Sequence, residues 1–177
     1  GSKHKHFYAS VHLSPTSYFA DQLKEFNAYM TKVSEYMRKG SNYSEIAAYL
    51  PVEDGHRTLY YPDELRYPGM NHQYQLSYVR TPEYLEGYQA TWINRQILLE
   101  GKMKKGRLVY ADRSFKAFAS DVEFMDIVSL RALVGHAQKG LPVILSRTPK
   151  QPGVKKSDEY AALLNQLKAL PNVSETP

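Results

Sequence analysis

Short apolar runs alternate with helix-like segments along most of this chain, and this alternation limits the fold more than any other feature. The clearest unit lies at residues 126–145. Asp126 is placed to cap a helix whose apolar residues recur every three or four positions until Gly140, and an apolar run at residues 141–145 follows directly. Strands buried on both faces in a parallel sheet have this composition. The sequence therefore predicts a helix followed by a buried parallel strand.

Two similar units precede this one. Residues 44–50 form a short apolar run closed by Pro51, which is typical of a buried strand. Residues 88–93 form a second run, after which Asn94 can cap a short helix that extends to residue 100. Both units therefore predict a strand whose carboxyl end leads into a polar segment.

The remaining elements complete the pattern. Residues 107–110 and 115–119 read as two more strands, and Ser157 opens a last helix that continues to residue 170. Strands joined by helices through short connections form a parallel sheet with right-handed crossovers. We therefore expect an α/β domain of the flavodoxin-like class over residues 44–177, with three layers and helices on both faces of the sheet.

Residues 1–43 are expected to form an N-terminal arm that contains one helix, from about residue 18 to residue 39. Ser17 can cap its start and Gly40 its end. Its apolar residues recur in steps of three and four, which places them on one face, and an exposed apolar face marks an interface. One expectation is therefore a homodimer through this helix. The apolar positions are Phe19, Leu23, Phe26, Met30, Val33 and Met37.

Composition excludes several classes of protein. The 177 residues contain no cysteine, which rules out disulfides, zinc–thiolate sites and thiol nucleophiles. The net charge of +5 comes from scattered basic residues rather than a stripe, so nucleic acid is not an expected partner. No apolar run approaches the ~18 residues of a membrane span, so a membrane is not expected either. Nothing in the composition fixes the compartment.

The two ends of the sequence suggest a piece of a longer protein. The chain begins with Gly1-Ser2 instead of a methionine, which resembles the remnant of a cleaved tag. Near the other end, residues 170–173 begin what reads as another strand, and the sequence stops soon afterwards. We therefore expect the α/β domain to be truncated at its C-terminus.

Tests for catalytic motifs favour a domain without its own chemistry. A phosphate or dinucleotide site needs a glycine-rich turn after the first strand, but residues 51–55 place Glu53 and Asp54 there. The Gly-x-Ser-x-Gly motif of serine hydrolases is absent. A glycosidase needs two carboxyl groups roughly 5–10 Å apart across the scissile bond, and adjacent residues do not take opposite faces of a sugar. Asp63 or Glu64 remains a conceivable second carboxylate, but we expect no catalytic residue, metal or cofactor.

The polar and aromatic loop at residues 52–69 is the best candidate for a binding site. Ligands of open α/β sheets bind at the carboxyl ends of the strands, where this loop begins. The alternative is that its first carboxylates only form a turn and cap helices. Two other residues are assigned to the structure: Trp92 more often belongs to a core than to a sugar platform, and His136 is expected on the polar flank of its helix. The substrate-binding candidates are Glu53, Asp54, His56, Arg57, Tyr60, Tyr61 and His72.

Several stretches together resemble a junction in large bacterial glycoside hydrolases of the α-L-rhamnosidase-like family. In that family a catalytic TIM barrel is followed by a flavodoxin-like, class I amidotransferase-like accessory domain. The β-galactosidases with a trimerisation domain of the same fold are the neighbouring comparison. The similarity extends from about residue 6 to residue 170 through dispersed motifs. The stretches that carry it are residues 6–10, 29–34, 48–54, 87–94 and 140–144.

The resemblance implies a role without catalysis. The family's acid and base lie on the barrel, so no catalytic residue carries over to this sequence. Residues 1–43 would be the tail of the barrel, and the loop that begins at Pro51 would lean over its mouth and shape the sugar site. The implied partners are the catalytic barrel of the parent chain and a carbohydrate, and family habit favours a periplasmic or secreted protein. The alternative is a stand-alone carbohydrate-binding or protein-interaction module.

Overall fold

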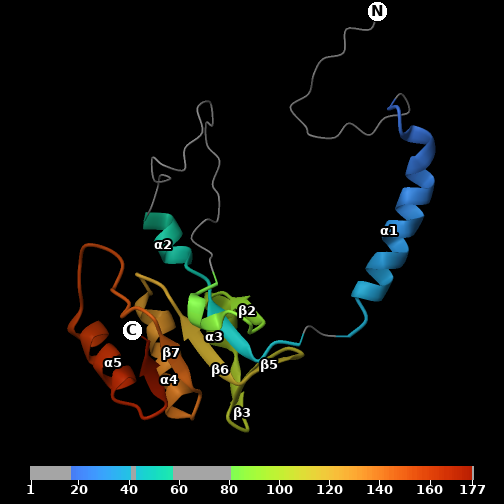
Figure 1. Ribbon diagram of the computed structural model, residues 1–177. Coiled ribbons are helices and arrows are strands. Elements are labelled where there is room, and N and C mark those ends of the chain that lie inside the picture. The colour runs from blue at the N-terminus through green and yellow to red at the C-terminus, as the bar shows by residue number, and fades with distance from the viewer. Residues whose placement is uncertain (1–16, 41–42, 58–80, 177) are drawn as a thin grey trace, which may run out of the picture. The chain divides into compact units, whose positions relative to one another are not determined.

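The computed structural model describes residues 17–40, 43–57 and 81–176, and the chain divides into two compact units, Gly1–Asn42 and Tyr43–Pro177 (Figure 1). The described part of the first unit is a 3-10 turn, η1 (Ala20–Gln22), followed by the helix α1 (Leu23–Met37). Gly40 follows the helix with a φ of +85°, a conformation that glycine adopts without strain. The predicted N-terminal helix is therefore confirmed. Gln22 rather than Ser17 precedes its first α-helical residue.

A five-stranded parallel sheet forms the centre of the second unit. The strand order is β2-β1-β6-β7-β8, which becomes 2-1-3-4-5 when the strands of this sheet are counted along the chain. This order is consistent with a flavodoxin-like fold. The predicted α/β class and parallel sheet are confirmed. The strands are β1 (Ile46–Tyr49), β2 (Ala90–Ile93), β6 (Ala117–Ser120), β7 (Val143–Leu145) and β8 (Val173–Glu175).

Three of the helices that follow strands of this sheet are α3 (Arg95–Glu100), α4 (Ile127–Gln138) and α5 (Asp158–Lys168). Each begins at a residue whose side chain accepts a hydrogen bond from a backbone N–H of the first turn. The three predicted caps are thus confirmed. They are Asn94, Asp126 and Ser157.

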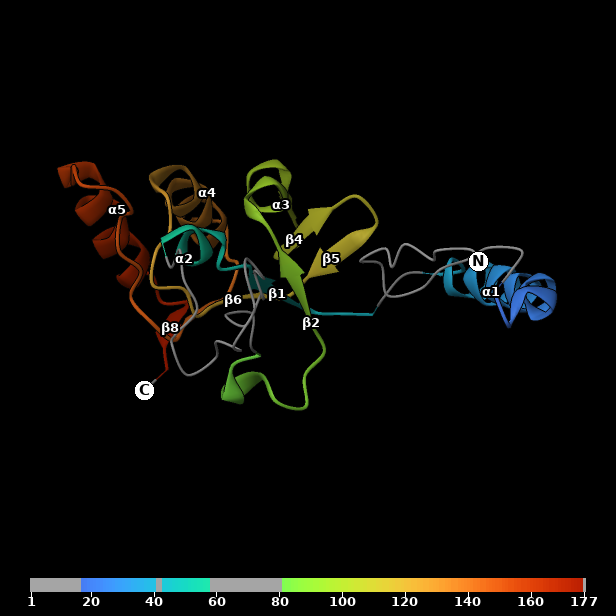
Figure 2. The ribbon, with the colours of Figure 1, turned by 90° about the horizontal axis from the view of Figure 1, so that it is seen from above.

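The helices α3, α4 and α5 lie side by side on one face of the sheet (Figure 2). From β2 onward, the chain adds β6, β7 and β8 in the same direction across the sheet. Right-handed crossovers that run in one direction place their helices on the same face of the sheet. On the opposite face, the described residues contribute the 3-10 turn η3 (Glu83–Leu85). The expected α-helices on both faces are therefore seen on one face, and residues 58–80 of the β1–β2 connection lie outside the described residues.

A second, antiparallel sheet interrupts the α/β pattern between α3 and β6. Its strands are β3 (Lys102–Lys104), β4 (Arg107–Tyr110) and β5 (Arg113–Phe115). The prediction of one strand over residues 115–119 is wrong, because the chain leaves one sheet and enters the other at Lys116. The backbone N–H groups of Lys116 and Ala117 both donate to the Glu45 carbonyl, which redirects the chain into the parallel sheet.

The hydrophobic core lies between the parallel sheet and its layer of helices. Phe118 and Tyr49 occupy neighbouring strands, are 0% and 2% exposed, and have ring centroids 5.9 Å apart. His136 is buried in this layer, and its Nε2 lies 2.8 Å from the Leu98 carbonyl oxygen, which links α4 to α3. The expected place of His136 on a polar flank is wrong. The helix residues that cover this face include Leu98, Leu130, Leu133, Val134 and Leu167.

Candidate functional site

Polar side chains gather where β1, β2 and β6 end. The chain passes from β1 to β2 on one side and returns to β6 on the other, so the sheet has its topological switch point between β1 and β6. Open α/β sheets bind ligands at such a point. The helix α2 (Val52–Arg57) follows β1 there, so the expected loop conformation is wrong for these six residues. Acidic residues in the first turn favour the helix because they complement its positive N-terminus.

Asp54 fixes the segment that follows β6. Its Oδ1 accepts a hydrogen bond of 2.7 Å from the backbone N–H of Phe124, and its Oδ2 accepts one of 2.9 Å from the backbone N–H of Glu123. Two short hydrogen bonds to one carboxylate are among the strong polar contacts of a protein. The side chain of Asp54 therefore connects α2 to the β6–α4 loop, across 70 positions of sequence.

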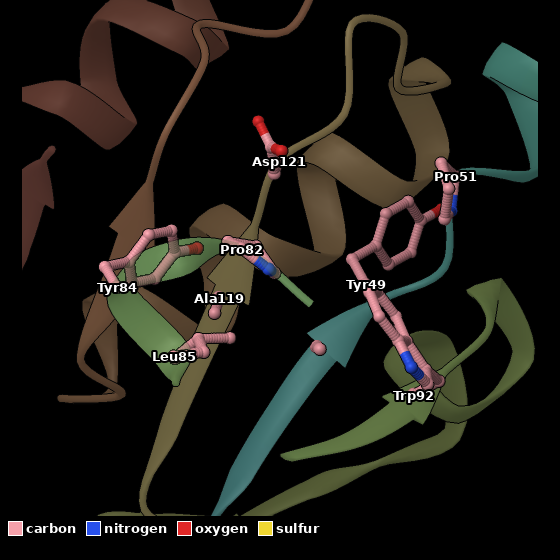
Figure 3. A pocket seen from close by; sticks show the side chains of 9 residues that line it. Tyr49, Pro51, Pro82, Tyr84, Leu85, Trp92, Ala119 and Asp121 are labelled. Carbon is pink, nitrogen blue, oxygen red and sulfur yellow. The ribbon is translucent and has the colours of Figure 1, made fainter. Parts of the chain in front are cut away.

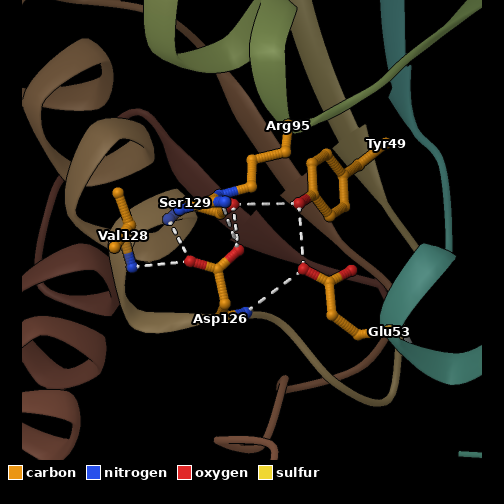
Figure 4. A network of polar contacts seen from close by, with 6 residues as sticks. All are labelled: Tyr49, Glu53, Arg95, Asp126, Val128 and Ser129. Atoms are coloured by element: carbon orange, nitrogen blue, oxygen red, sulfur yellow. Dashed lines mark hydrogen bonds and ion pairs between the residues drawn. The ribbon is translucent and has the colours of Figure 1, made fainter. Parts of the chain in front are cut away.

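A second polar network lies beside Asp54 and joins β1, α2 and α4 (Figure 4). The Tyr49 hydroxyl lies 3.0 Å from Ser129 Oγ and 3.4 Å from Glu53 Oε1. Ser129 Oγ donates to Asp126 Oδ2 at 2.6 Å, and Asp126 Oδ1 accepts from the first-turn amides of α4. Arg95 Nε lies 3.3 Å from Asp126 Oδ2. The network thus connects Asp126, which caps α4, to Tyr49 at the end of β1 and to Arg95, which follows β2.

The two carboxyl groups of this network have opposite pKa shifts. Burial raises the pKa of Glu53 above its ordinary value, and the neighbouring Asp126 carboxyl raises it further. Burial acts in the same direction on Asp126, but hydrogen bonds from Ser129 and Val128 outweigh it and lower the pKa of Asp126. Among the described residues, Glu53 Oε2 is buried and has no hydrogen-bond partner. Of the two carboxyl groups, Glu53 is therefore the one whose protonated form the folded domain favours.

Replacing Glu53 by glutamine is expected to raise the melting temperature by a few degrees at pH 7. The raised pKa of Glu53 means that the native state favours the protonated form, so its stability contribution is complete at low pH and is lost as pH rises through the native pKa. Glutamine has no charge to bury at neutral pH. The gain should shrink toward pH 4, as measured by thermal unfolding across pH. Glu123→Gln at an exposed ion pair with Lys150 is the control, and a less stable Glu53→Gln protein at pH 7 would contradict the assignment.

An open groove of about 820 Å³ runs between α2 and α3 at this edge of the sheet. Glu53 and His56 line it from α2, while Arg95 and Leu99 line it from α3. Val52 and Leu99 also line it and are 39% and 40% exposed, so the groove combines exposed apolar area with polar groups. The binding residues predicted from the sequence include Glu53 and His56 on the α2 side of the groove. The prediction missed the α3 side because the helix cap at Asn94 gave no sign that α3 lies beside α2.

A second cavity lies on the other face of the sheet, beneath η3 (Figure 3). It is lined by Trp92, Tyr84, Leu85 and Asp121, among others, and encloses about 10 Å³. This is room for about one water molecule. Trp92 therefore lines a space too small for a sugar ring, and the groove between α2 and α3 is the larger candidate site.

The other predicted binding residues are placed as follows. Arg57 is the last residue of α2, whereas Tyr60, Tyr61 and His72 lie outside the described residues. Within residues 17–40, 43–57 and 81–176, no three His, Asp or Glu side chains are grouped as a metal site would require. In the same ranges, no helix has the length and apolar character needed to cross a membrane.

The fold and the groove define the class of protein: an α/β domain with a parallel sheet and an open groove at the carboxyl ends of its strands. Comparison with protein-family models, curated proteins and solved structures finds no match for the chain. The resemblance to glycoside hydrolases therefore stays a prediction.

Proposed function

We propose that this chain is a non-catalytic, flavodoxin-like accessory domain of a bacterial glycoside hydrolase of the α-L-rhamnosidase-like family. The observation that carries the absence of catalysis is the engagement of the carboxylates at the switch point in hydrogen bonds within the domain. The family assignment rests on the sequence resemblance. The strand order supports the flavodoxin-like part of the proposal.

The carboxylates are poorly arranged for glycoside hydrolysis. An acid and a base must both reach the scissile bond from opposite sides. Both oxygens of Asp54 accept backbone hydrogen bonds from the β6–α4 loop, and both oxygens of Asp126 accept hydrogen bonds within α4. Glu53 directs one oxygen at Tyr49 and buries the other. These side chains stabilise the loops around the groove, so the three described carboxyl groups at this edge of the sheet are all engaged within the domain.

The groove between α2 and α3 is the surface through which we propose that the domain contacts the catalytic barrel of its parent chain. Its exposed Val52 and Leu99 offer apolar area, while His56 and Arg95 offer polar contacts around it. Interfaces between domains of one chain combine apolar and polar groups in this way. A carbohydrate bound in the same groove by a stand-alone module is the second candidate, favoured by the polar side chains that converge on an open hollow.

Assays of the 177-residue chain against aryl rhamnosides and aryl galactosides test the proposal. We expect no turnover by this chain and turnover by a longer protein encoded at the same locus. Calorimetric titration with rhamnose and galactose separates the two candidates, because binding by the chain alone favours the module. Turnover by these 177 residues that disappears in the Glu53→Gln variant would overturn the proposal.

A further inference from the structure

The small antiparallel sheet of β3, β4 and β5 has one buried face and one outer face. Met103, Leu108 and Phe115 stand opposite one another in its register, and their side chains belong to the hydrophobic core or pack against it. Side chains alternate between the two faces along a strand, so the residues before and after this row point away from the core. The residues of the outer face are Lys102, Lys104, Arg107, Val109 and Ser114.

The cations at the outer face differ in whether a carboxylate balances their charge. Arg107 and Lys116, the residue after β5, both contact the carboxylate of Glu45. Lys102 and Lys104 are exposed, and neither forms an ion pair with a carboxylate in the part of the chain that the structure describes. The unbalanced positive charge of this face therefore lies along β3.

β3 is also an edge strand. It pairs with β4 on one side, and no strand of the described ranges pairs with its other side. A strand at a sheet edge presents backbone N–H and C=O groups that an added strand can bind. Because Lys102 and Lys104 stand on the same face of β3, two residues of an added strand, two positions apart, would lie beside them. Opposite charges stabilise such cross-strand pairs.

We propose that β3 is a docking edge for an extended acidic segment of a partner protein. The segment adds to the sheet as a further strand and places carboxylates at alternate positions, beside Lys102 and Lys104. Backbone hydrogen bonds provide affinity in this mode of recognition, and the side chains provide specificity. The docking edge belongs to the sheet that joins the amino ends of β1 and β6, at the other end of the parallel strands from the groove (Figure 1). It therefore does not depend on the function of the groove.

Other parts of the same chain do not supply this strand. A second copy of β3 would place lysine beside lysine, and like charges in this position are destabilising. The acidic residues of the first unit lie in η1 and α1, which are not extended. Outside the described residues the sequence contains two acidic residues, Asp63 and Glu64, and adjacent positions would point to opposite faces of a strand. The acidic strand therefore comes from a partner.

The outer face suits a peptide better than a nucleic acid. Proteins that bind single-stranded nucleic acid stack the bases on aromatic side chains. The outer face carries no aromatic residue, and its uncharged members are Val109 and Ser114. A nucleic acid would also leave the backbone groups at the edge of β3 without a strand partner, whereas a peptide strand binds them.

Titration of the isotope-labelled 177-residue chain with two synthetic peptides, followed by NMR, tests the docking edge. One peptide alternates threonine with glutamate over about eight residues, so that its carboxylates share one face of a strand. The other peptide has the same composition, but its glutamates stand in adjacent pairs. We expect the alternating peptide to shift the amide signals of β3 and to bind about fivefold more tightly, because only this peptide places carboxylates beside both lysines.

Three outcomes of this titration would overturn the proposal. Equal affinity for the two peptides would mean that net charge, and not an added strand, causes the binding. No binding of the alternating peptide up to millimolar concentration would mean that the lysines only guard the edge against other strands. Tighter binding of a thymidine oligonucleotide than of the alternating peptide would identify the partner as a nucleic acid.

Charge reversal on β3 gives a second test, with a gain of binding as one readout. The protein with Lys102→Glu and Lys104→Glu should lose at least about tenfold in affinity for the alternating glutamate peptide, and it should bind a peptide that alternates threonine with lysine. The protein with Lys24→Glu and Lys32→Glu has the same net charge, changed at exposed positions of α1, and should bind like the parent. An equal loss of affinity in this control would contradict a docking edge at β3.

Discussion

Replacement of Asp54 by alanine is expected to lower the free energy of unfolding of the α/β unit by about 3 kcal/mol. The side chain accepts two short hydrogen bonds from the backbone N–H groups of Glu123 and Phe124, and hydrogen bonds to charged groups contribute about 1.5–3 kcal/mol each. Alanine would remove both acceptors and loosen the connection between α2 and the β6–α4 loop. Urea denaturation followed by circular dichroism measures the change.

Two further variants make the Asp54 experiment specific. Asp54→Asn keeps one acceptor but turns an NH₂ group toward the second backbone donor, so it should lose about as much stability as one of the two bonds. Glu123→Ala removes an exposed ion pair with Lys150 and should change stability by less than about 1 kcal/mol. An Asp54→Ala protein as stable as the parent would show that the loop is held by other contacts. It would also return Asp54 to the candidates for ligand binding.

The role of Asp54 also shows why the sequence predicted the elements better than the site. The caps Asn94, Asp126 and Ser157 were found because a cap and the amides it binds lie within three residues of each other. The contact between Asp54 and Phe124 joins residues 70 positions apart, and nothing in the spacing of either residue indicates it. Local signals placed the helices and strands, whereas the site depends on which strand ends the fold brings together.

The antiparallel sheet was missed for a related reason. Its strands β3, β4 and β5 are three or four residues long, and runs of this length do not reveal their partners. The turn from β3 to β4 has a left-handed backbone at Lys105 and Gly106. The only sequence signal for this turn is the Lys-Gly pair itself. A Lys-Gly pair is a weaker turn signal than Asn-Gly. The parallel strands β2 and β7 were predicted more successfully because the next helix after each begins at a recognisable cap, Asn94 or Ser157.

Removal of the Tyr49 side chain beyond its Cβ is expected to be the most destabilising of the changes considered. Tyr49 is 2% exposed on β1, and its ring packs near Phe118 on the neighbouring strand. Replacing a buried aromatic residue by alanine costs about 3–5 kcal/mol through lost burial and the cavity that remains. Tyr49→Ala should therefore unfold at much lower urea concentration than the parent.

Tyr49→Phe separates the contribution of the ring from that of the hydroxyl. It keeps the packing against Phe118 and removes the contacts with Ser129 Oγ and Glu53 Oε1, at an expected cost of about 1 kcal/mol. If both variants lose the same stability, the polar network rather than the ring holds β1 against α4, and the carboxyl groups at the switch point matter more than the core. A small loss in Tyr49→Phe and a large one in Tyr49→Ala would instead mean that the sheet core positions Glu53 and Asp126. The packing of the sheet core would then determine the shape of the groove.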